Sequence, residues 1–232
     1  MKKLILVMSI LGFAVLAQAQ NNKVDMPPVV KKVTLGYDVY NTFWMDMPTG
    51  LNTRLINQGF NTFLMYNHTM NKKGNLSFAG GLGLTNENLF FKKAYIPNIN
   101  ADSVVFADVP NGVQAKRSKL NMTYLDIPIE LRFVTKSKMR FTLGLKFGFL
   151  INSKTLYKGH ALDGSGTKVH VKQRDVNSLE GTRFGLQARI GYKWIHAYAY
   201  YSLNKVFKAD KGPYLLPIAH HLSLIAYHSQ LL

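Results

Sequence analysis

Hydrophobic and polar residues alternate with a period of two along much of the chain. The clearest stretch runs from Lys138 to Asn152, where every second residue is hydrophobic and most residues between them are polar or glycine. Leu150 is the exception on the polar side. A helix would spread the hydrophobic residues around its circumference, whereas a strand places them on one face. The pattern therefore predicts a long β-strand with one hydrophobic and one polar face.

Seven further stretches alternate in the same way, three of them strongly. The strong stretches are residues 75–85, 124–133 and 183–194, and the weaker ones are residues 32–42, 59–69, 196–206 and 218–229. Pro128 lies inside one strong stretch and has no N–H to donate, so we expect a bulge or a tolerated gap there. The sequence thus predicts an all-β fold of eight antiparallel strands.

The connections between these strands alternate between long and short. In chain order they are residues 43–58, 70–74, 86–120, 134–137, 153–182, Ile195 alone, and 207–217. Outer-membrane β-barrels have short periplasmic turns and long external loops, with strands that alternate in the same way. We therefore predict an eight-stranded transmembrane β-barrel with both chain ends on the periplasmic side.

Alternation alone leaves open which face is enclosed, because a soluble, lipocalin-like barrel would turn its hydrophobic face inward. The predicted strands, however, are as long as a tilted membrane strand needs to be. Glycines also accompany long charged side chains on the polar face, which suits a crowded interior. Aromatic residues near the strand ends are the candidates for a membrane-interface girdle: Trp44, Phe133, Tyr192, Trp194 and Phe207.

Eight strands enclose a space that side chains can fill. The charged residues predicted to point inward carry both signs, and we expect a lumen ionic network that holds the strands in register. Its predicted members are Asp38, Asp126, Glu130, Arg132, Arg140, Lys146, Arg183, Arg189 and Lys193. The alternative is a narrow, anion-preferring channel for small solutes, which the excess of basic residues would favour.

The first residues have the three parts of a secretory signal. Lys2 and Lys3 precede a hydrophobic stretch over residues 4–16, and Ala17-Gln18-Ala19 matches the small-x-small cleavage pattern. The hydrophobic stretch is too short to span a bilayer as a helix. We expect residues 1–19 to be a cleaved signal peptide, residues 20–31 a periplasmic N-terminal segment, and residues 32–232 the barrel domain.

The formal charge is +17, and the sequence contains no cysteine. A basic chain often binds nucleic acid, but export argues against that partner and favours outer-membrane lipid and lipopolysaccharide. The predicted external loops are strongly basic, with Lys92, Lys93, Lys116, Arg117, Lys154, Lys158, Lys168, Lys172 and Arg174. Without cysteine there is no disulfide, lipoprotein anchor or thiolate metal site, and we predict no cofactor.

Some small outer-membrane barrels are enzymes, so a lipid-modifying or proteolytic surface enzyme is a second alternative. His220, His221 and Ser223 are the place to look, but the two histidines would point to opposite faces and no acid accompanies them. His160, His170 and Asp163 share a long loop, where we expect solvated residues and no metal site. The chain is therefore predicted not to be an enzyme.

Residues 124–133, with the sequence YLDIPIELRF, resemble the YLxIPLxLK strand of PorT-like outer-membrane β-barrels from Bacteroidota. The glycine-rich residues 80–83 and Lys146-Phe147-Gly148 support this resemblance, which spans most of residues 30–230. It implies an eight-stranded barrel, and the founding type is similar to a component of the type IX secretion machinery. The C-terminal residues depart from the aromatic end that such barrels usually have.

These observations together predict a non-enzymatic outer-membrane protein that acts as a scaffold or component of an outer-membrane complex related to secretion. Other proteins of that complex would be its partners.

Overall fold

The computed structural model describes residues 32–192 and 195–224, with the backbone alone for residues 219–224. The described chain is all-β, and no helix in it is long and apolar enough to cross a membrane. The strands are β1 (Val33–Met45), β2 (Gln58–Thr69), β3 (Leu76–Phe91), β4 (Ala94–Tyr95), β5 (Ala107–Asp108), β6 (Ala115–Val134), β7 (Met139–His160), β8 (Lys168–Arg174), β9 (Thr182–Tyr192), β10 (Ile195–Ser202) and β11 (Leu216–Leu224).

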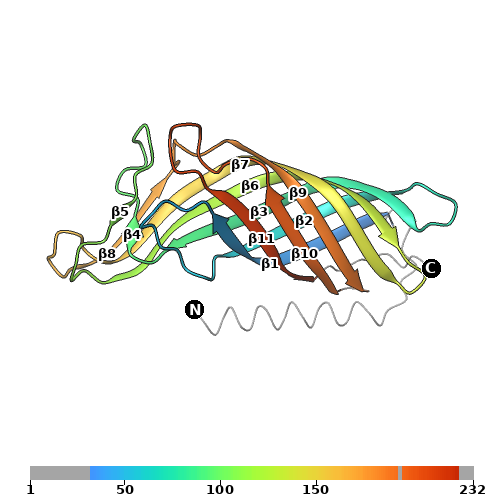
Figure 1. Cartoon of the computed structure of the whole chain (residues 1–232), viewed down its shortest axis with the longest axis horizontal. Coiled ribbons are helices and arrows are strands. Elements are labelled where there is room, and N and C mark those ends of the chain that lie inside the picture. Colours follow the sequence, from blue (N-terminus) through green and yellow to red (C-terminus); the bar gives the residue numbers. More distant parts are fainter. Residues whose placement is uncertain (1–31, 193–194, 225–232) are drawn as a thin grey trace.

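Eight of these strands form a ring of antiparallel pairings (Figure 1). The order is β1-β2-β3-β6-β7-β9-β10-β11, and β11 pairs with β1 again. The ladders are uneven: β6 and β7 pair along nearly their whole length, whereas the β1–β11 ladder is interrupted at Val39 and Tyr40. Strand β8 extends the sheet beside β7, and β4 and β5 form a separate small hairpin.

Because neighbouring strands are antiparallel, their connections gather at two ends. Residues 70–75 and 135–138 connect strands at one end, where β9 and β10 also meet, and we call it the short-turn end. Residues 46–57, 92–114, 161–181 and 203–215 connect strands at the opposite end, which we call the long-loop end. Figure 1 shows β4, β5 and β8 at the long-loop end.

Pro128 fits into β6 without a change of register. On the β7 side it pairs regularly with Lys146. On the β3 side the pairs Gly80–Ile129 and Gly83–Asp126 keep one register, and the two positions between them are not paired. The ladder therefore has a gap where the proline lacks its N–H. A register shift in the β6–β7 ladder lies elsewhere, opposite Thr123 and Tyr124, where Ile151 of β7 is the extra residue.

Three strands run further toward the long-loop end than the alternation predicted. Strand β3 continues to Phe91, β6 begins at Ala115 and β7 continues to His160. The predicted loops 86–120 and 153–182 were therefore partly wrong. The physical reason is that hydrophobic residues move from the outward to the inward face near the long-loop end of these strands. An alternation with hydrophobic residues on one face therefore ends before the strand does.

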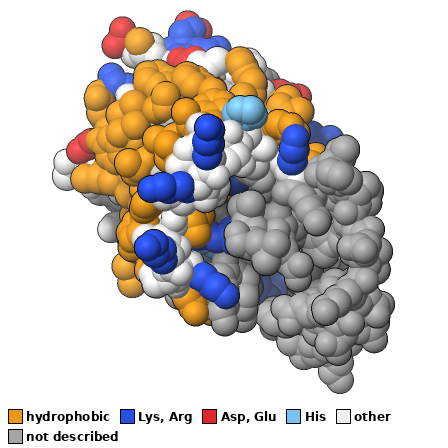
Figure 2. Space-filling model, turned by 90° about the vertical axis from the view of Figure 1, so that its right-hand side faces the viewer, with side chains coloured by type: hydrophobic (Ala, Val, Ile, Leu, Met, Phe, Trp, Pro, Cys, Tyr) orange, Lys and Arg blue, Asp and Glu red, His pale blue; other side chains and the backbone are white. Residues whose placement is uncertain are grey.

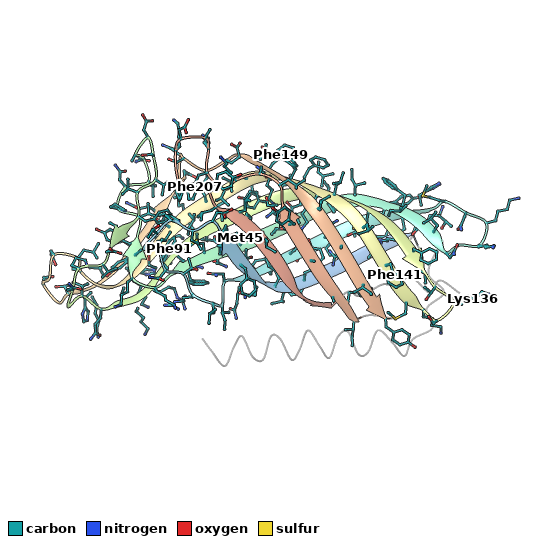
Figure 3. All side chains as sticks on the ribbon, viewed as in Figure 1. Met45, Phe91, Lys136, Phe141, Phe149 and Phe207 are labelled. Atoms are coloured by element: carbon teal, nitrogen blue, oxygen red, sulfur yellow. The ribbon has the colours of Figure 1, made fainter. Side chains whose placement is uncertain are left out.

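Hydrophobic side chains point outward over the wall nearest the short turns. Strand β7 illustrates this, because Leu143, Leu145 and Phe147 are exposed while Thr142, Lys146 and Gly148 on the opposite face are buried. Phe141 and Phe149 project from the same wall in Figure 3. We call this surface the hydrophobic belt: Leu35, Val39, Leu64, Leu82, Leu84, Leu125, Ile127, Leu131, Phe141, Leu143, Leu145, Phe147, Phe149, Leu186 and Ile190.

The short-turn end itself is basic. Figure 2 views the molecule from this end and shows lysine and arginine side chains around it, with hydrophobic side chains over the adjoining wall. The exposed lysines of the two described turns are Lys72, Lys73, Lys136 and Lys138, and Lys136 is labelled in Figure 3. A hydrophobic wall that ends in a charged rim is typical of a membrane-spanning barrel.

Beyond the belt, toward the long-loop end, the hydrophobic side chains point inward. Leu89, Phe91 and Leu120 are fully buried there, and they pack with loop residues into one cluster, of which Figure 3 labels Phe91 and Phe207. We call it the cap cluster: Trp44, Leu89, Phe91, Ala94, Ile96, Ile99, Val104, Leu120, Met122, Tyr124, Val176, Leu179, Val206, Phe207 and Leu215. Leu150, the exception in its strand, packs against this cluster from the inside of the ring.

The cap cluster corrects part of the predicted aromatic girdle. Trp44 and Phe207 are buried within the cluster, so neither lies at a membrane interface. Both residues continue the inward face of their segments, which becomes hydrophobic at this level. Phe133 and Tyr192 do point outward near the short-turn end, and Trp194 lies outside the described residues.

Candidate functional site

Eight charged side chains are buried among the described residues, and all of them point into the ring. We call them the interior network: Asp38, Glu87, Asp126, Glu130, Arg132, Lys146, Arg183 and Arg189. They come from strands β1, β3, β6, β7 and β9, which surround the interior. Strand alternation places each of them on the face opposite the hydrophobic belt. The network is the most heavily charged part of the described interior and is therefore the candidate site.

One half of the network is centred on Arg189. Its guanidinium binds both carboxylate oxygens of Asp38, with N–O distances of 2.9 and 3.1 Å. Its Nε lies 3.4 Å from Glu130, which also accepts bonds from Arg132 at 2.8 and 2.5 Å. Gln187 donates at 3.1 Å to the Glu130 oxygen that Arg189 also contacts, and both Arg132 bonds go to the other oxygen. Each buried carboxylate thus has at least two donors, which offsets part of its desolvation cost.

The other half is centred on Arg183. This guanidinium is bidentate to Asp126, because its Nε donates to Oδ1 at 3.2 Å and its Nη2 donates to Oδ2 at 2.8 Å, and its Nη1 donates to Glu87 at 2.6 Å. The Lys146 ammonium lies 3.8 Å from Asp126, and the Tyr40 hydroxyl donates to Glu87 at 3.2 Å. Planar, bidentate arginine–carboxylate pairs are among the strongest hydrogen-bonded contacts in proteins. They join β9 to β6 and β3 across the interior.

Polar side chains link the two halves. Asn61 donates to Asp38 at 2.9 Å, and its other amide atom lies 3.0 Å from the Thr85 hydroxyl. Thr85 in turn hydrogen-bonds Asp126. The described hydrogen bonds thus connect the two carboxylate centres into one chain. Connected buried polar groups that are satisfied together tend to rigidify a structure and fix its register.

Aromatic rings and a glycine shape the space around the arginines. The Arg183 guanidinium lies 4.0 Å from the centre of the Tyr124 ring, and that of Arg189 lies 4.2 Å from the centre of the Tyr198 ring. Such contacts stabilise a buried cation. A Cβ at Gly148 would lie 2.4 Å from Asp126 Oδ1 and 2.8 Å from Arg183 Cγ. The glycine therefore makes room for this ion pair.

The buried charges balance. The interior network has four carboxylates and four basic groups, so it has no net formal charge. The sequence suggested an excess of basic residues inside, because the predicted set includes Arg140 and Lys193, which are not among the buried charges described here, and omits Glu87. The balance means that the buried charges described here give no electrostatic preference for anions.

The structure brings together seven of the nine residues predicted for the network: Asp38, Asp126, Glu130, Arg132, Lys146, Arg183 and Arg189. Arg140 faces the same way but is half-buried near the short-turn end, and Lys193 lies outside the described residues. Glu87 was missed. It could have been found by continuing the polar phase of β3 from Thr85 by two residues.

The residues considered for other chemistry do not form a described site. His220, His221 and Ser223 lie in β11, but their side chains are outside the described part of the chain. His160 ends β7, His170 lies in β8 and Asp163 lies in the turn between them. Among the described residues, no group of three histidines, cysteines or acids is placed to hold a metal ion.

A ring of antiparallel strands with a hydrophobic outer wall and enclosed charges defines the class of outer-membrane β-barrel proteins. The family model of the outer membrane protein β-barrel domain matches residues 18–208 of this sequence, and the chain belongs to that family.

Comparison with solved structures and curated proteins adds little to this assignment. The chain is similar to Ail, the attachment invasion locus protein of Yersinia pestis. The TM-score is 0.40 at 11% sequence identity, over 83% of this chain and 95% of that one. No curated protein matches the sequence.

Proposed function

We propose that the chain is a closed, eight-stranded outer-membrane barrel that neither conducts solutes nor catalyses a reaction. The change of face along β3, β6 and β7 is the observation that carries this proposal. Along these strands most hydrophobic residues point outward over the belt, and most point inward beyond it, where Phe90 and Leu156 are outward exceptions. A wall that must meet lipid at one level and water at the next has this pattern. The long-loop end is then external.

The interior network and the cap cluster support a closed lumen. An eight-stranded barrel has an interior that side chains can fill. The network occupies it at the level of the belt, and the cap cluster fills it toward the long-loop end. Moving an ion past paired buried charges would require breaking pairs such as Arg183–Asp126, at a cost of several kcal/mol.

Planar-bilayer recording tests closure directly. The inserted full chain should give no discrete conductance steps, whereas a variant that truncates both arginine centres, Arg183→Ala with Arg189→Ala, should give steps or a raised leak. Discrete, anion-selective steps from the unmodified chain would favour the narrow channel instead.

We further propose that the barrel is a component of an outer-membrane complex related to secretion. The PorT-like motif of residues 124–133 supports this role, as do hydrophobic side chains exposed on the loops, such as Leu55, Val105 and Tyr214. A photo-crosslinker at Leu55 or Tyr214 should capture a protein of defined mass in native membranes. The same group at Leu145, in the belt, should capture lipid alone. Lipid adducts at all three positions would contradict the role in a complex.

A further inference from the structure

Basic side chains cover the outward face of the sheet immediately beyond the hydrophobic belt. They lie on β6, β7 and β8 near the long-loop end (Figure 1). We call this surface the basic face: Arg117, Lys119, Lys154, Lys158, His170, Lys172 and Arg174. In the sequence these residues looked like two separate basic loops. The strand pairings place them on one surface.

The register puts the basic residues opposite one another. Lys154 pairs with Arg174, and Lys158 lies between Arg117 and His170 in a three-strand row. In the intervening row Lys119 and Lys172 flank Leu156. Directly opposed residues have Cβ atoms about 4.5–5.5 Å apart, and like charges at that spacing destabilise a sheet.

No acid relieves this repulsion within the rows. The outward positions of β3 in these rows hold Asn88 and Phe90, and no aspartate or glutamate occupies a described outward position of the rows. The Lys119 ammonium donates to the Asn88 side chain at 2.7 Å, which is a neutral partner. Partial burial and the neighbouring Arg117 and Lys154 lower the pKa of Lys119 to about 8. The face therefore has a concentrated positive potential.

The basic face begins at a defined distance from the belt. The last belt row contains Leu84, Leu125 and Phe149, and the next outward row contains Asn86, Thr123 and Asn152. The first basic row, with Lys154 and Arg174, follows directly. From Leu125 to Asn121 the strand rises roughly 13 Å. In a membrane-spanning barrel this is the level at which acyl chains give way to lipid headgroups.

We propose that the basic face binds the phosphate groups of a lipid of the external leaflet, of the lipid A type. This inference rests on the proposed barrel orientation, which turns the face toward the bilayer rather than toward the interior. Several ammonium and guanidinium groups at headgroup level attract anionic phosphates. A bound phosphate would also relieve the repulsion between Lys154 and Arg174. The continuity of the face with the belt favours a lipid over a free anion.

Titration of the full chain in non-ionic detergent micelles tests the assignment. The probes are lipid A, dephosphorylated lipid A and inorganic phosphate. Lipid A should bind saturably, and the binding should weaken as salt is raised. The variant Lys119→Gln, Lys154→Gln, Lys172→Gln should bind lipid A at least about tenfold more weakly. A matched control makes the same change at the short-turn end: Lys72→Gln, Lys73→Gln, Lys136→Gln. It should bind lipid A as the unmodified chain does.

The outcomes separate this inference from the proposed function. Equal binding of lipid A and its dephosphorylated form, or an equal loss in both variants, would overturn the phosphate assignment. Competition by inorganic phosphate at matched concentration would overturn the choice of a lipid.

Insertion of the full chain into phosphatidylcholine vesicles is measured in parallel, as a test of the membrane barrel. Failure to insert would refute the membrane barrel itself, and insertion without preference for lipid A would refute the basic face alone.

Discussion

At the scale of single residues, the buried ion pairs are the feature with the largest desolvation cost. Glu130 is fully buried and accepts bonds from Arg132, Arg189 and Gln187. Taking so many charges out of water is unfavourable unless every charge is matched. Their arrangement therefore makes the network sensitive to the loss of any one member.

Glu130→Gln should lower the free energy of unfolding by about 3–5 kcal/mol, because it leaves two buried arginines facing a neutral amide. Urea unfolding of the chain in micelles measures the change. Asp163→Asn removes a carboxylate from an exposed turn and should shift stability by less than about 0.5 kcal/mol. Similar effects of the two substitutions would show that the network is solvated rather than enclosed.

Lys119 gives a prediction about pH. Its pKa is lowered to about 8 in the folded chain from an ordinary value of 10.5, so the unfolded chain binds more protons at this site between those values. Stability should therefore rise with pH across that window. Lys119→Gln should remove this contribution, so that stability differs less between about pH 7 and about pH 10. An unchanged slope in the variant would assign the pH dependence to other groups.

Sequence reasoning found most of the network because a strand fixes which side chains share a face. Once Asp126 and Glu130 are on one face of β6, Arg132 must join them. Sequence reasoning failed where the interior that a strand faces changes from polar to hydrophobic. Trp44 and Phe207 looked like girdle residues from their position at strand ends, but the interior is hydrophobic at their level and encloses them. Glu130 and Arg132 are neighbours on one face of β6, but the pairs Arg189–Asp38 and Arg183–Asp126 depend on positions across the ring, which no local pattern contains.

At the scale of elements, β7 combines two kinds of strand. Its first half turns hydrophobic residues outward and charged residues inward, like a membrane strand. Its second half turns Tyr157 inward and Lys154 and Lys158 outward, like a strand at a water-exposed surface. The inversion occurs at a bulge in β7 itself, where Ile151 is the extra residue opposite Thr123 and Tyr124 of β6. The sequence prediction made these strands too short, because it extended each strand only as far as hydrophobic residues stay on the outward face.

Leu145→Arg tests the first half of β7. Leu145 points outward near the middle of the belt, and an arginine facing lipid at that depth costs about 2–4 kcal/mol. The free energy of unfolding of the chain refolded in phospholipid vesicles should fall by that amount. Leu55→Arg, at an exposed loop position, should have almost no effect. A tolerated arginine at position 145 would mean that this wall faces water.

At the scale of the whole molecule, the order of long and short connections carried as much information as the strands. It placed the two described turns and the long loops at opposite ends, as the structure has them. The joining of β11 to β1 follows from no local signal, because it pairs the first strand of the sheet with the last one along the chain. The cap cluster was likewise unpredicted, since it assembles residues from several loops that are far apart in sequence.

The most direct test of the account measures what the outer wall contacts. The sequence has no cysteine, so a single introduced cysteine can be labelled uniquely with a nitroxide spin label. In vesicles, labels at Leu143, Leu145 and Phe147 should be relaxed far more by oxygen than by a water-soluble nickel complex. A label at Lys158 should show the reverse. Water-level access of the nickel complex at Leu143, Leu145 and Phe147 would contradict a lipid-facing belt and the barrel orientation built on it.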